Sequence, residues 1–170
     1  MKRIITATVL NKSGVLNRVT GVMSRRRFNI ESISVGQTEN VNISRITFVV
    51  VVDMIDDIEQ LTKQLNKQID VLKVNDITDE SVIARELALV KLSTNKTTRS
   101  EIYSLIEPFR ASVIDVSKDS LVVQVTGTNT KVEALIDLLR PFGIKEIART
   151  GVTAFTRSVK IEEKPTAFIS

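Results

Sequence analysis

The sequence of 170 residues contains no cysteine and no histidine, and its aromatic side chains are limited to six phenylalanines and one tyrosine. Without cysteine the protein cannot form disulfides, thiolate nucleophiles or zinc–thiolate sites. Without histidine it lacks the side chain whose ordinary pKa best suits proton transfer near neutral pH. The usual catalytic triads are therefore excluded. Catalysis by Asp, Glu, Lys or Ser remains open, but the composition argues against an enzyme.

Long hydrophobic runs are absent as well. The first apolar run ends at Asn11, and it is too short for a secretion signal or for a membrane span. No other stretch qualifies, so we expect a soluble, cytoplasmic protein that does not enter a membrane.

The basic residues give a formal net charge of +4, but they are scattered along the chain apart from Arg25, Arg26 and Arg27. This triplet falls in the last turn of an expected helix, where cations complement the helix dipole and the unpaired carbonyls. No stripe of basic and aromatic residues accompanies it, as nucleic-acid binding would require. We therefore favour a capping or solvated role and expect no nucleic-acid partner.

Hydrophobic spacing predicts two successive units in which strands and helices follow the order βαββαβ, the ferredoxin-like α+β sandwich. In the first unit, strands are expected over residues 2–10, 30–38, 44–52 and 69–77. One helix has an apolar face at Val15, Leu16, Val19, Val22 and Met23, and the other begins near Asp56. Residues 48–52 form a continuous apolar run, which is typical of a central strand buried on both faces.

The same order repeats after a polar and acidic linker, which we assign to residues 78–85. Strands are expected over residues 86–92, 111–116, 120–126 and 144–155, the last with a bend at Gly151. The predicted organisation is an N-terminal domain of residues 1–77, a C-terminal domain of residues 86–157 and a flexible tail of residues 158–170. Three helices are expected to begin at capping boxes, formed by Asp56 with Glu59, Thr98 with Glu101 and Thr130 with Glu133.

The segment most suited to ligand binding is the turn of residues 11–16, which leads directly into a helix. The first amides of a helix have no partners within it, and the dipole favours an anion there by about 0.3–1 kcal/mol. Gly14 leaves those amides accessible, and Asn11 offers both a donor and an acceptor to an amino acid. Val15 and Leu16 can line an aliphatic pocket.

Simpler explanations exist for the same residues. On spacing alone, Ser13 is favoured as an ordinary N-cap, and Asn29 as a turn residue between a helix and a strand. The acidic group at Asp53, Asp56 and Asp57 matches no calcium-loop spacing, and helix capping explains it without a metal.

Several runs in the sequence resemble the acetolactate (acetohydroxyacid) synthase small subunits. Residues 11–18, NKSGVLNR, followed by residues 28–32, FNIES, resemble the N-terminal ACT domain of that family. The resemblance continues through KQLNK at residues 63–67, DVLKV at 70–74, RELALVK at 85–91 and ARTG at 148–151. Together these runs span both halves of the chain.

The resemblance implies a non-catalytic regulatory subunit that activates a catalytic large subunit. It also implies feedback inhibition by a branched-chain amino acid, which within the family is usually valine. The ACT domain is expected to form a homodimer through its edge strand, residues 30–38. The effector would bind at the junction, between Asn11, Gly14, Val15 and Leu16 of one subunit and Asn29 and Ile30 of the other. The thiamine diphosphate, FAD and magnesium of the family belong to the large subunit, and no cofactor or metal is expected in this chain.

Two further expectations concern partners. Residues 36–43 lie beside the implied effector site, which makes them a candidate contact with the catalytic subunit. The main alternative is a stand-alone ACT-type sensor that regulates another enzyme or transcription, which would have a complete effector site but no stable complex with a synthase large subunit.

Overall fold

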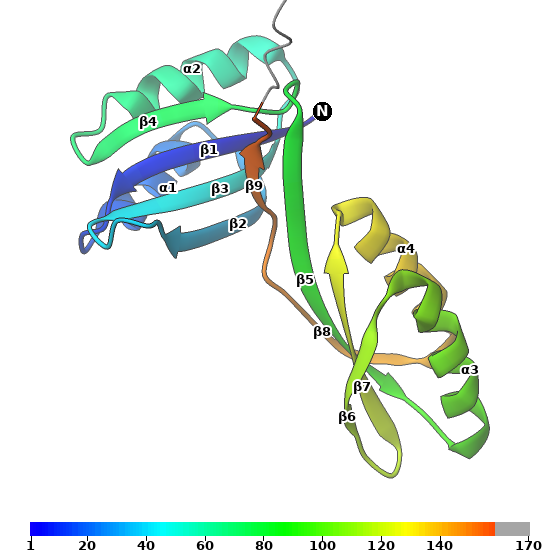
Figure 1. Ribbon diagram of the computed structural model, residues 1–170. Coiled ribbons are helices and arrows are strands. Elements are labelled where there is room, and N and C mark those ends of the chain that lie inside the picture. The colour runs from blue at the N-terminus through cyan, green and yellow to red at the C-terminus, as the bar shows by residue number, and fades with distance from the viewer. Residues whose placement is uncertain (159–170) are drawn as a thin grey trace, which may run out of the picture.

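Residues 1–158 are described by the computed structural model, and they form two ferredoxin-like units that follow one another along the chain (Figure 1). Each unit has the order βαββαβ, which confirms the predicted α+β fold class. The predicted tail of residues 158–170 lies, apart from its first residue, outside the described residues. Within residues 1–158, none of the helices has the length and apolar character needed to cross a lipid bilayer.

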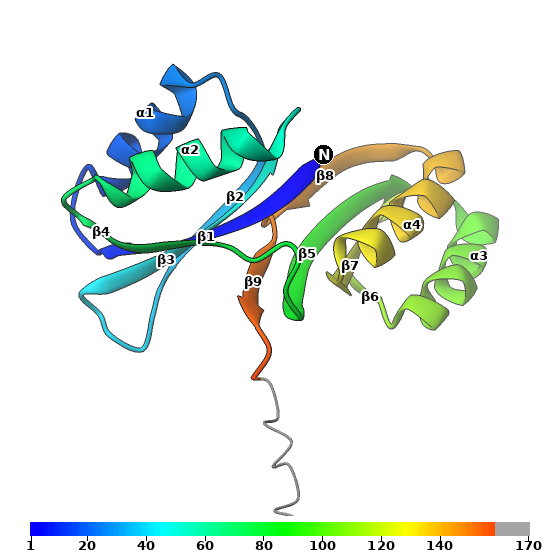
Figure 2. The same ribbon diagram turned by 90° about the horizontal axis from the view of Figure 1, so that it is seen from above.

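The N-terminal unit is a four-stranded antiparallel sheet with two helices on one face (Figure 2). Its elements are β1 (Lys2–Leu10), α1 (Val15–Arg25), β2 (Asn29–Gln37), β3 (Ile43–Val51), α2 (Ile55–Asn66) and β4 (Val71–Asp76). The strands lie in the order β2-β3-β1-β4, so β2 is an edge strand, as expected from the sequence.

Successive side chains of the central strands β1 and β3 lie on opposite faces of the sheet, and one of these faces carries the core. The side chains that face α1 and α2 are Ile5, Ala7 and Val9 of β1 and Ile46, Phe48 and Val50 of β3, all buried in one cluster. Leu16, expected on the apolar face of α1, is instead 43% exposed. Four buried residues at helical spacing, Val15, Val19, Val22 and Met23, suffice to cover this part of the sheet.

The C-terminal unit has its own core. Its elements are β5 (Val82–Ser93), α3 (Lys96–Ile106), β6 (Ser112–Val116), β7 (Ser120–Gly127), α4 (Asn129–Leu139), β8 (Ile144–Arg149) and β9 (Thr153–Thr156), with short 3-10 turns after α3 and α4. The sheet order is β6-β7-β5-β8, and α3 and α4 lie on one face. The strands expected over residues 111–116 and 120–126 are β6 and β7, which pair with each other as an antiparallel hairpin.

The two units are joined by a two-stranded ribbon that lies on the helix-free face of the N-terminal sheet (Figure 1). The first part of β5 pairs with β9, and Val152 and Ala154 are buried with Val49 of β3 and with Ile77. Val49 is consequently only 7% exposed although it faces away from α1 and α2. This explains the apolar run in β3, which is buried on both faces as predicted as far as Val50, whereas Val51 at the end of the strand is 36% exposed.

The ribbon corrects the expected linker. Residues 82–85, assigned to the linker, are the beginning of β5, because Val82 and Ala84 pack against the N-terminal sheet. The turn between the units is therefore limited to residues 77–81. The last strand, expected over residues 144–155, is divided into β8 and β9 at Gly151, where a bend was predicted and where the backbone adopts a left-handed φ of 76°.

The capping boxes expected at Asp56, Thr98 and Thr130 are wrong, because each of these helices begins two or three residues earlier. The observed N-caps are Met54 for α2, Asn95 for α3 and Thr128 for α4. The side-chain oxygen of Asn95 accepts hydrogen bonds from the backbone N–H groups of Thr97 and Thr98, at 2.9 Å each. Polar residues that can cap also occur within first turns, so the sequence pattern alone places a helix start poorly.

Replacing Phe48 tests the core of the N-terminal unit. The Phe48 side chain is 0% exposed, so Phe48→Ala is expected to lower the free energy of unfolding by about 3–5 kcal/mol. The matched control is Phe155→Ala in β9, where the ring is 54% exposed and the expected loss is below about 1 kcal/mol. Both values are measured by denaturant unfolding, and equal losses would contradict this description of the core.

Candidate functional site

The turn after β1 is held to the loop that precedes β3. The backbone N–H of Asn11 donates to the carbonyl of Asn42 at 2.7 Å, and Asn11 Nδ2 donates to the carbonyl of Val41 at 2.9 Å. Within residues 1–158 the Oδ1 atom of Asn11 accepts no hydrogen bond, so it is available as an acceptor. Asn11 therefore fixes this loop and still presents an oxygen to a ligand.

Gly14 occupies the N-cap position of α1, with a left-handed φ of 81° and no side-chain hydrogen bond to the first turn. The simpler explanation of Ser13 as the N-cap is therefore wrong. The first amides of α1 are not capped by a side chain, although the N–H of Val15 donates to the carbonyl of Lys12 at 3.4 Å, and Gly14 puts no side chain of its own in front of them. This is an arrangement that suits a small anion such as a carboxylate.

Arg18 adds positive charge to this end of α1, a contribution that sequence reasoning did not assign. A Cβ atom built on Gly14 would lie 3.1 Å from Arg18 Nη1, so the guanidinium stands directly beside the glycine. Arg18 also forms an ion pair with Asp70. Its spacing of one helical turn from Gly14 is the signal that could have identified it.

The aliphatic residues of this segment have different surroundings. Val15 is buried in the core of the N-terminal unit, so its side chain faces away from any ligand at the surface. Leu16 is exposed and is the aliphatic side chain that this turn offers to a partner.

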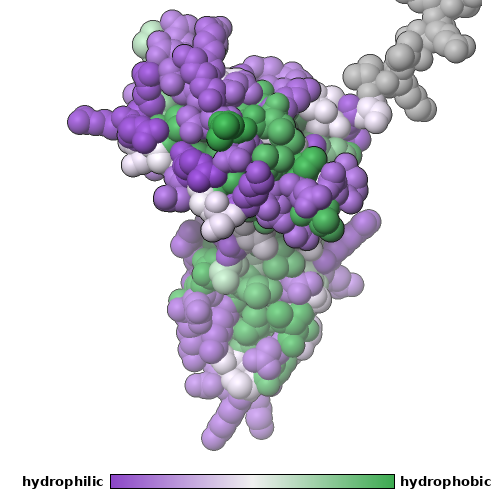
Figure 3. Space-filling model, turned by 90° about the vertical axis from the view of Figure 1, so that its left-hand side faces the viewer, coloured by the Kyte–Doolittle hydropathy of each residue, from purple (hydrophilic) through white to green (hydrophobic). Residues whose placement is uncertain are grey.

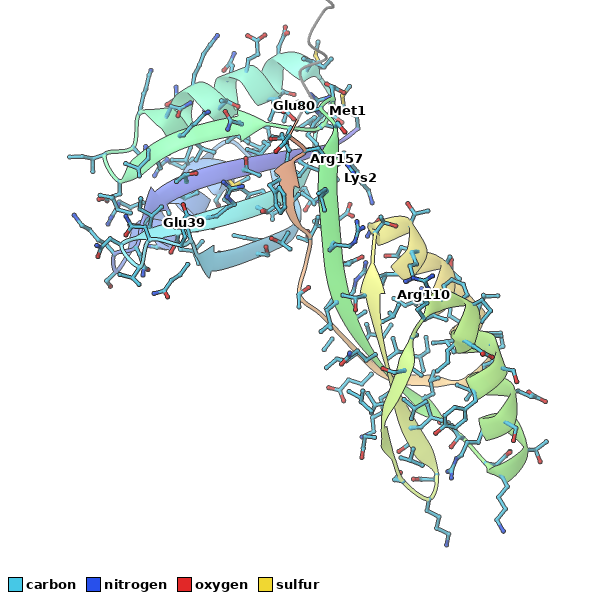
Figure 4. All side chains as sticks on the ribbon, in the orientation of Figure 1. Met1, Lys2, Glu39, Glu80, Arg110 and Arg157 are labelled. Atoms are coloured by element: carbon cyan, nitrogen blue, oxygen red, sulfur yellow. The ribbon has the colours of Figure 1, made fainter. Side chains whose placement is uncertain are left out.

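Asn29 and Ile30 lie at the opposite end of the sheet. Asn29 pairs with Val51 at the end of β3, whereas Leu10, next to Asn11, pairs with Ile43 at its beginning. The nine residues of β2 separate the two ends by roughly 25 Å at the usual rise per residue. Figure 4 shows the same separation, with Lys2 near one end of the sheet and Glu39 at the other. The six candidate residues thus form two groups that a single chain does not bring together.

The surface around the second group is hollowed. A groove of about 500 Å³ runs along α1 and the start of β2, lined by Asn17, Thr20, Gly21, Ser24, Phe28 and Ile30. The same edge of the unit carries the exposed Val35 on β2. Apolar surface of this kind is visible on both units in the view of Figure 3, bordered by polar side chains.

A second group of polar side chains lies in the C-terminal unit, on the side that faces the N-terminal sheet, and had no role in the sequence-based hypothesis. The Glu86 side chain is 2% exposed, and its carboxylate accepts hydrogen bonds from Arg149 Nη2 at 2.6 Å and Asn129 Nδ2 at 3.1 Å. Arg149 also bonds Glu133 of α4 at 2.5 Å. Burial alone would lower the pKa of Arg149, but the hydrogen bonds and charges of Glu86 and Glu133 outweigh it and raise that pKa.

This cluster borders a cavity of about 530 Å³ between the N-terminal sheet and the C-terminal unit, whose lining also includes Ser32, Ile33 and Gly151. Its charged groups are bonded to one another, as buried ions must be, and all of them belong to the C-terminal unit, so the cluster fixes β8 and α4 to β5. In the part of the chain that the structure describes, no group of three or more Asp, Glu, His or Cys side chains is arranged to hold a metal ion.

Both units match families of known proteins. A family model described as "AHAS small subunit-like ACT domain", where AHAS denotes acetohydroxyacid synthase, matches residues 5–73. A second, described as "Small subunit of acetolactate synthase", matches residues 85–158.

Individual relatives extend the match over nearly the whole chain. The acetolactate synthase small subunit of Bacillus subtilis (strain 168) is 66% identical over 160 residues, which cover 94% of this chain and 93% of the relative. A probable acetolactate synthase small subunit of Archaeoglobus fulgidus is 50% identical over 160 residues, covering 94% of this chain and 99% of the relative. The crystal structure of the acetolactate synthase small subunit from Thermotoga maritima superimposes with a TM-score of 0.85 at 38% identity, covering 94% and 99% of the two chains.

Substitution of Arg149 tests the polar cluster. Arg149→Met leaves the carboxylate of Glu86 buried and unpaired, so we expect a loss of about 2–3 kcal/mol in the free energy of unfolding, below the cost for a fully buried pair because Arg149 is partly exposed. The matched control is Arg140→Met, which breaks an exposed pair with Asp137 and should cost less than about 1 kcal/mol. Equal losses in denaturant unfolding would show that the cluster stabilises the C-terminal unit no more than an exposed ion pair does.

Proposed function

The chain belongs to the family of acetolactate synthase small subunits, and from this membership we propose that it is the non-catalytic subunit that regulates the synthase in branched-chain amino acid biosynthesis. It activates the catalytic large subunit in the cytoplasm and makes it sensitive to feedback inhibition by a branched-chain amino acid, with valine the first candidate. The thiamine diphosphate, FAD and magnesium of the reaction belong to that large subunit. The observation that carries the proposal is the 66% identity to the Bacillus subtilis relative across 94% of the chain.

Two copies of the chain pair through β2 in this proposal. β2 is an outer strand, and its outer backbone groups would otherwise promote unspecific association. Antiparallel pairing of two β2 strands around a two-fold axis joins both sheets into one, and it uses the same surface on each copy. The exposed Val35 then lies within the contact.

The two-fold arrangement also assembles the effector site from its two halves. Antiparallel pairing places the Asn29 end of one β2 beside the Gln37 end of the other. Gln37 lies at the end of the sheet where β1 finishes and α1 begins. Asn11 and Gly14 of one copy therefore approach Asn29 of the other, and a dimer contains two equivalent sites.

The chemistry of each site suits an aliphatic amino acid. The ligand carboxylate is bound by the first amides of α1 in front of Gly14, with Arg18 adding positive charge. The ammonium group is bound by Asn11 Oδ1. Leu16 of one copy and Ile30 of the other provide the aliphatic wall, while Val15 supports the turn from within the core.

Asn11 links the effector site to the loop proposed to contact the large subunit, residues 36–43. Its Nδ2 donates to the carbonyl of Val41, so a ligand that moves Asn11 also moves the loop. The loop carries Glu39 at the free end of the sheet, where a partner can reach it (Figure 4). Inhibition then requires that the effector bind the inactive arrangement of the complex more tightly than the active one.

Effector binding is tested by isothermal titration of the purified chain with valine, leucine and isoleucine. Gly14→Asp is expected to weaken binding by about tenfold or more, which is about 1.4 kcal/mol, because its carboxylate repels that of the ligand. The matched control is Gly14→Asn, which has the same size and tolerates the same left-handed backbone but carries no charge.

Retained binding in Gly14→Asn and its loss in Gly14→Asp would support both the site and the sensor role. If none of the three amino acids binds the unmodified chain, the effector site is wrong. Valine and leucine differ by one methylene, so we expect their affinities to differ by only about 1–3 kcal/mol.

The dimer is tested by sedimentation velocity. Val35→Lys puts a lysine on each paired edge strand, where a charged side chain must lose water within the contact, so we expect the dimer to dissociate into monomers. The matched control is Val41→Lys, which changes an exposed valine outside β2. A Val35→Lys variant that remains dimeric would overturn pairing through β2.

A further inference from the structure

The C-terminal unit has no part in the effector site as proposed, yet it touches the strand that carries half of that site. We propose that Gly151 is a positioning residue through which the state of β2 is transmitted to the C-terminal unit. The inference rests on the proposed function, because it concerns how effector binding at β2 acts on the rest of the subunit.

Gly151 lies directly on the backbone of β2. A Cβ atom at this position would be 3.1 Å from the carbonyl oxygen of Ile33 and 3.3 Å from Ser32 Cβ. The left-handed φ of 76° disfavours any other residue for a separate reason. The next residue, Val152, donates its backbone N–H to Ser32 Oγ at 3.4 Å. The close approach and the backbone conformation together require glycine.

The contact is next to an irregularity in β2. The register between β2 and β3 shifts between Ile30 and Ser32, which makes Glu31 a bulged residue. Asn29 and Ile30, proposed to bind the effector, lie on one side of the bulge, and the part of the strand under Gly151 lies on the other. Bulges bend a strand and re-aim its side chains, so a ligand that reorients Asn29 and Ile30 displaces the carbonyl of Ile33 against Gly151.

On its other side, Gly151 is firmly attached to the C-terminal unit. Thr150 accepts a hydrogen bond from the backbone N–H of Leu87 through its hydroxyl, and its own N–H donates to the Leu87 carbonyl, both at 3.1 Å. Arg149 bonds Glu86 of β5 and Glu133 of α4. A displacement of Gly151 is therefore passed to β5 and to α4.

Space for such a movement exists on both sides of the contact between Gly151 and β2. Cavities of about 530 Å³ and about 660 Å³ lie between the units, and Gly151 and Thr150 line both of them. Because packed interiors resist deformation, the units can tilt relative to each other only where packing is incomplete. The β5–β9 ribbon supplies the pivot of the tilt, and Gly151 is the point where β2 acts on it.

The test begins with the unmodified full-length chain. Its effector binding and its inhibition of the reconstituted synthase are measured first, and they establish the proposed function independently of Gly151. Hydrogen exchange is then followed with and without saturating valine. We expect valine to change the protection of residues 144–152 and of α4, which lie outside the effector site. Unchanged protection in these segments, in a chain that binds valine and inhibits, would overturn the inference while leaving the proposed function in place.

The variant Gly151→Ala is then compared with Gly143→Ala. Gly143 also has a left-handed backbone, with φ at 87°, but a Cβ there would meet only Ser93 at an ordinary 3.6 Å. The control therefore reproduces the backbone strain without the clash on β2. For Gly151→Ala we expect the affinity for valine to stay within about threefold of that of the unmodified chain. The hydrogen-exchange response of α4 to valine should be lost. Inhibition of the synthase at saturating valine should fall at least about fivefold, which is the low end of ordinary allosteric couplings.

The two variants discriminate between signalling and a merely structural role. If Gly151 has only a structural role, both variants should be less stable, and the folded fraction of each should still confer full inhibition by valine. The inference predicts instead that Gly151→Ala alone binds valine but no longer confers full inhibition. Full inhibition and a normal exchange response in Gly151→Ala would overturn it. If this variant fails to fold, the exchange measurement on the unmodified chain still decides the question.

Discussion

The architecture depends on one strand, β5, whose backbone is hydrogen-bonded to strands that serve different units. Residues 88–92 pair with β8 inside the C-terminal sheet, and residues 82–85 pair with β9 over the N-terminal sheet. Backbone hydrogen bonds are directional, so the orientation of one unit relative to the other is set by a continuous strand instead of a flexible connection. The burial of Val49, the left-handed turn at Gly151 and the cavities beside it all follow from this pairing.

Much of the fold was predictable because local patterns agree with it. Period-two and period-3.6 spacing identified the strands and helices of both units, and the apolar run in β3 indicated a strand covered on both faces. The errors arose where tertiary contacts determine the start of a helix, the burial of a side chain or the extent of a strand. Polar residues at Asp56 and Thr98 imitated helix caps, and the apolar Leu16 imitated a core residue. Residues 82–85 were taken for a linker because their strand partner, β9, lies some seventy residues further along the chain.

The candidate site was only partly accessible from the sequence for a similar reason. The turn of residues 11–16 could be identified as a candidate for anion binding, and the structure shows a helix start without a side-chain cap there, at Gly14. The proximity of Arg18, the buried pair of Glu86 and Arg149, and the contact of Gly151 with β2 required coordinates. A residue whose role is to touch backbone leaves almost no trace in a single sequence. In the sequence Gly151 was visible as a bend and as the last residue of the ARTG run, and neither signal indicated a contact with β2.

The ribbon has a consequence for how the chain is made. Synthesis proceeds from the N-terminus, and the ribosome must add residues 77 to 156 after β4 before β9 is complete. At about 5–20 residues per second this takes on the order of 4–16 s. During that interval the nascent N-terminal unit has all six of its own elements, but Val49 and Ile77 still lack the partners that bury them. A chain that ends before β9 would keep Val49 and Ile77 exposed, so β9 covers an apolar surface of the N-terminal unit to which chaperones could otherwise bind.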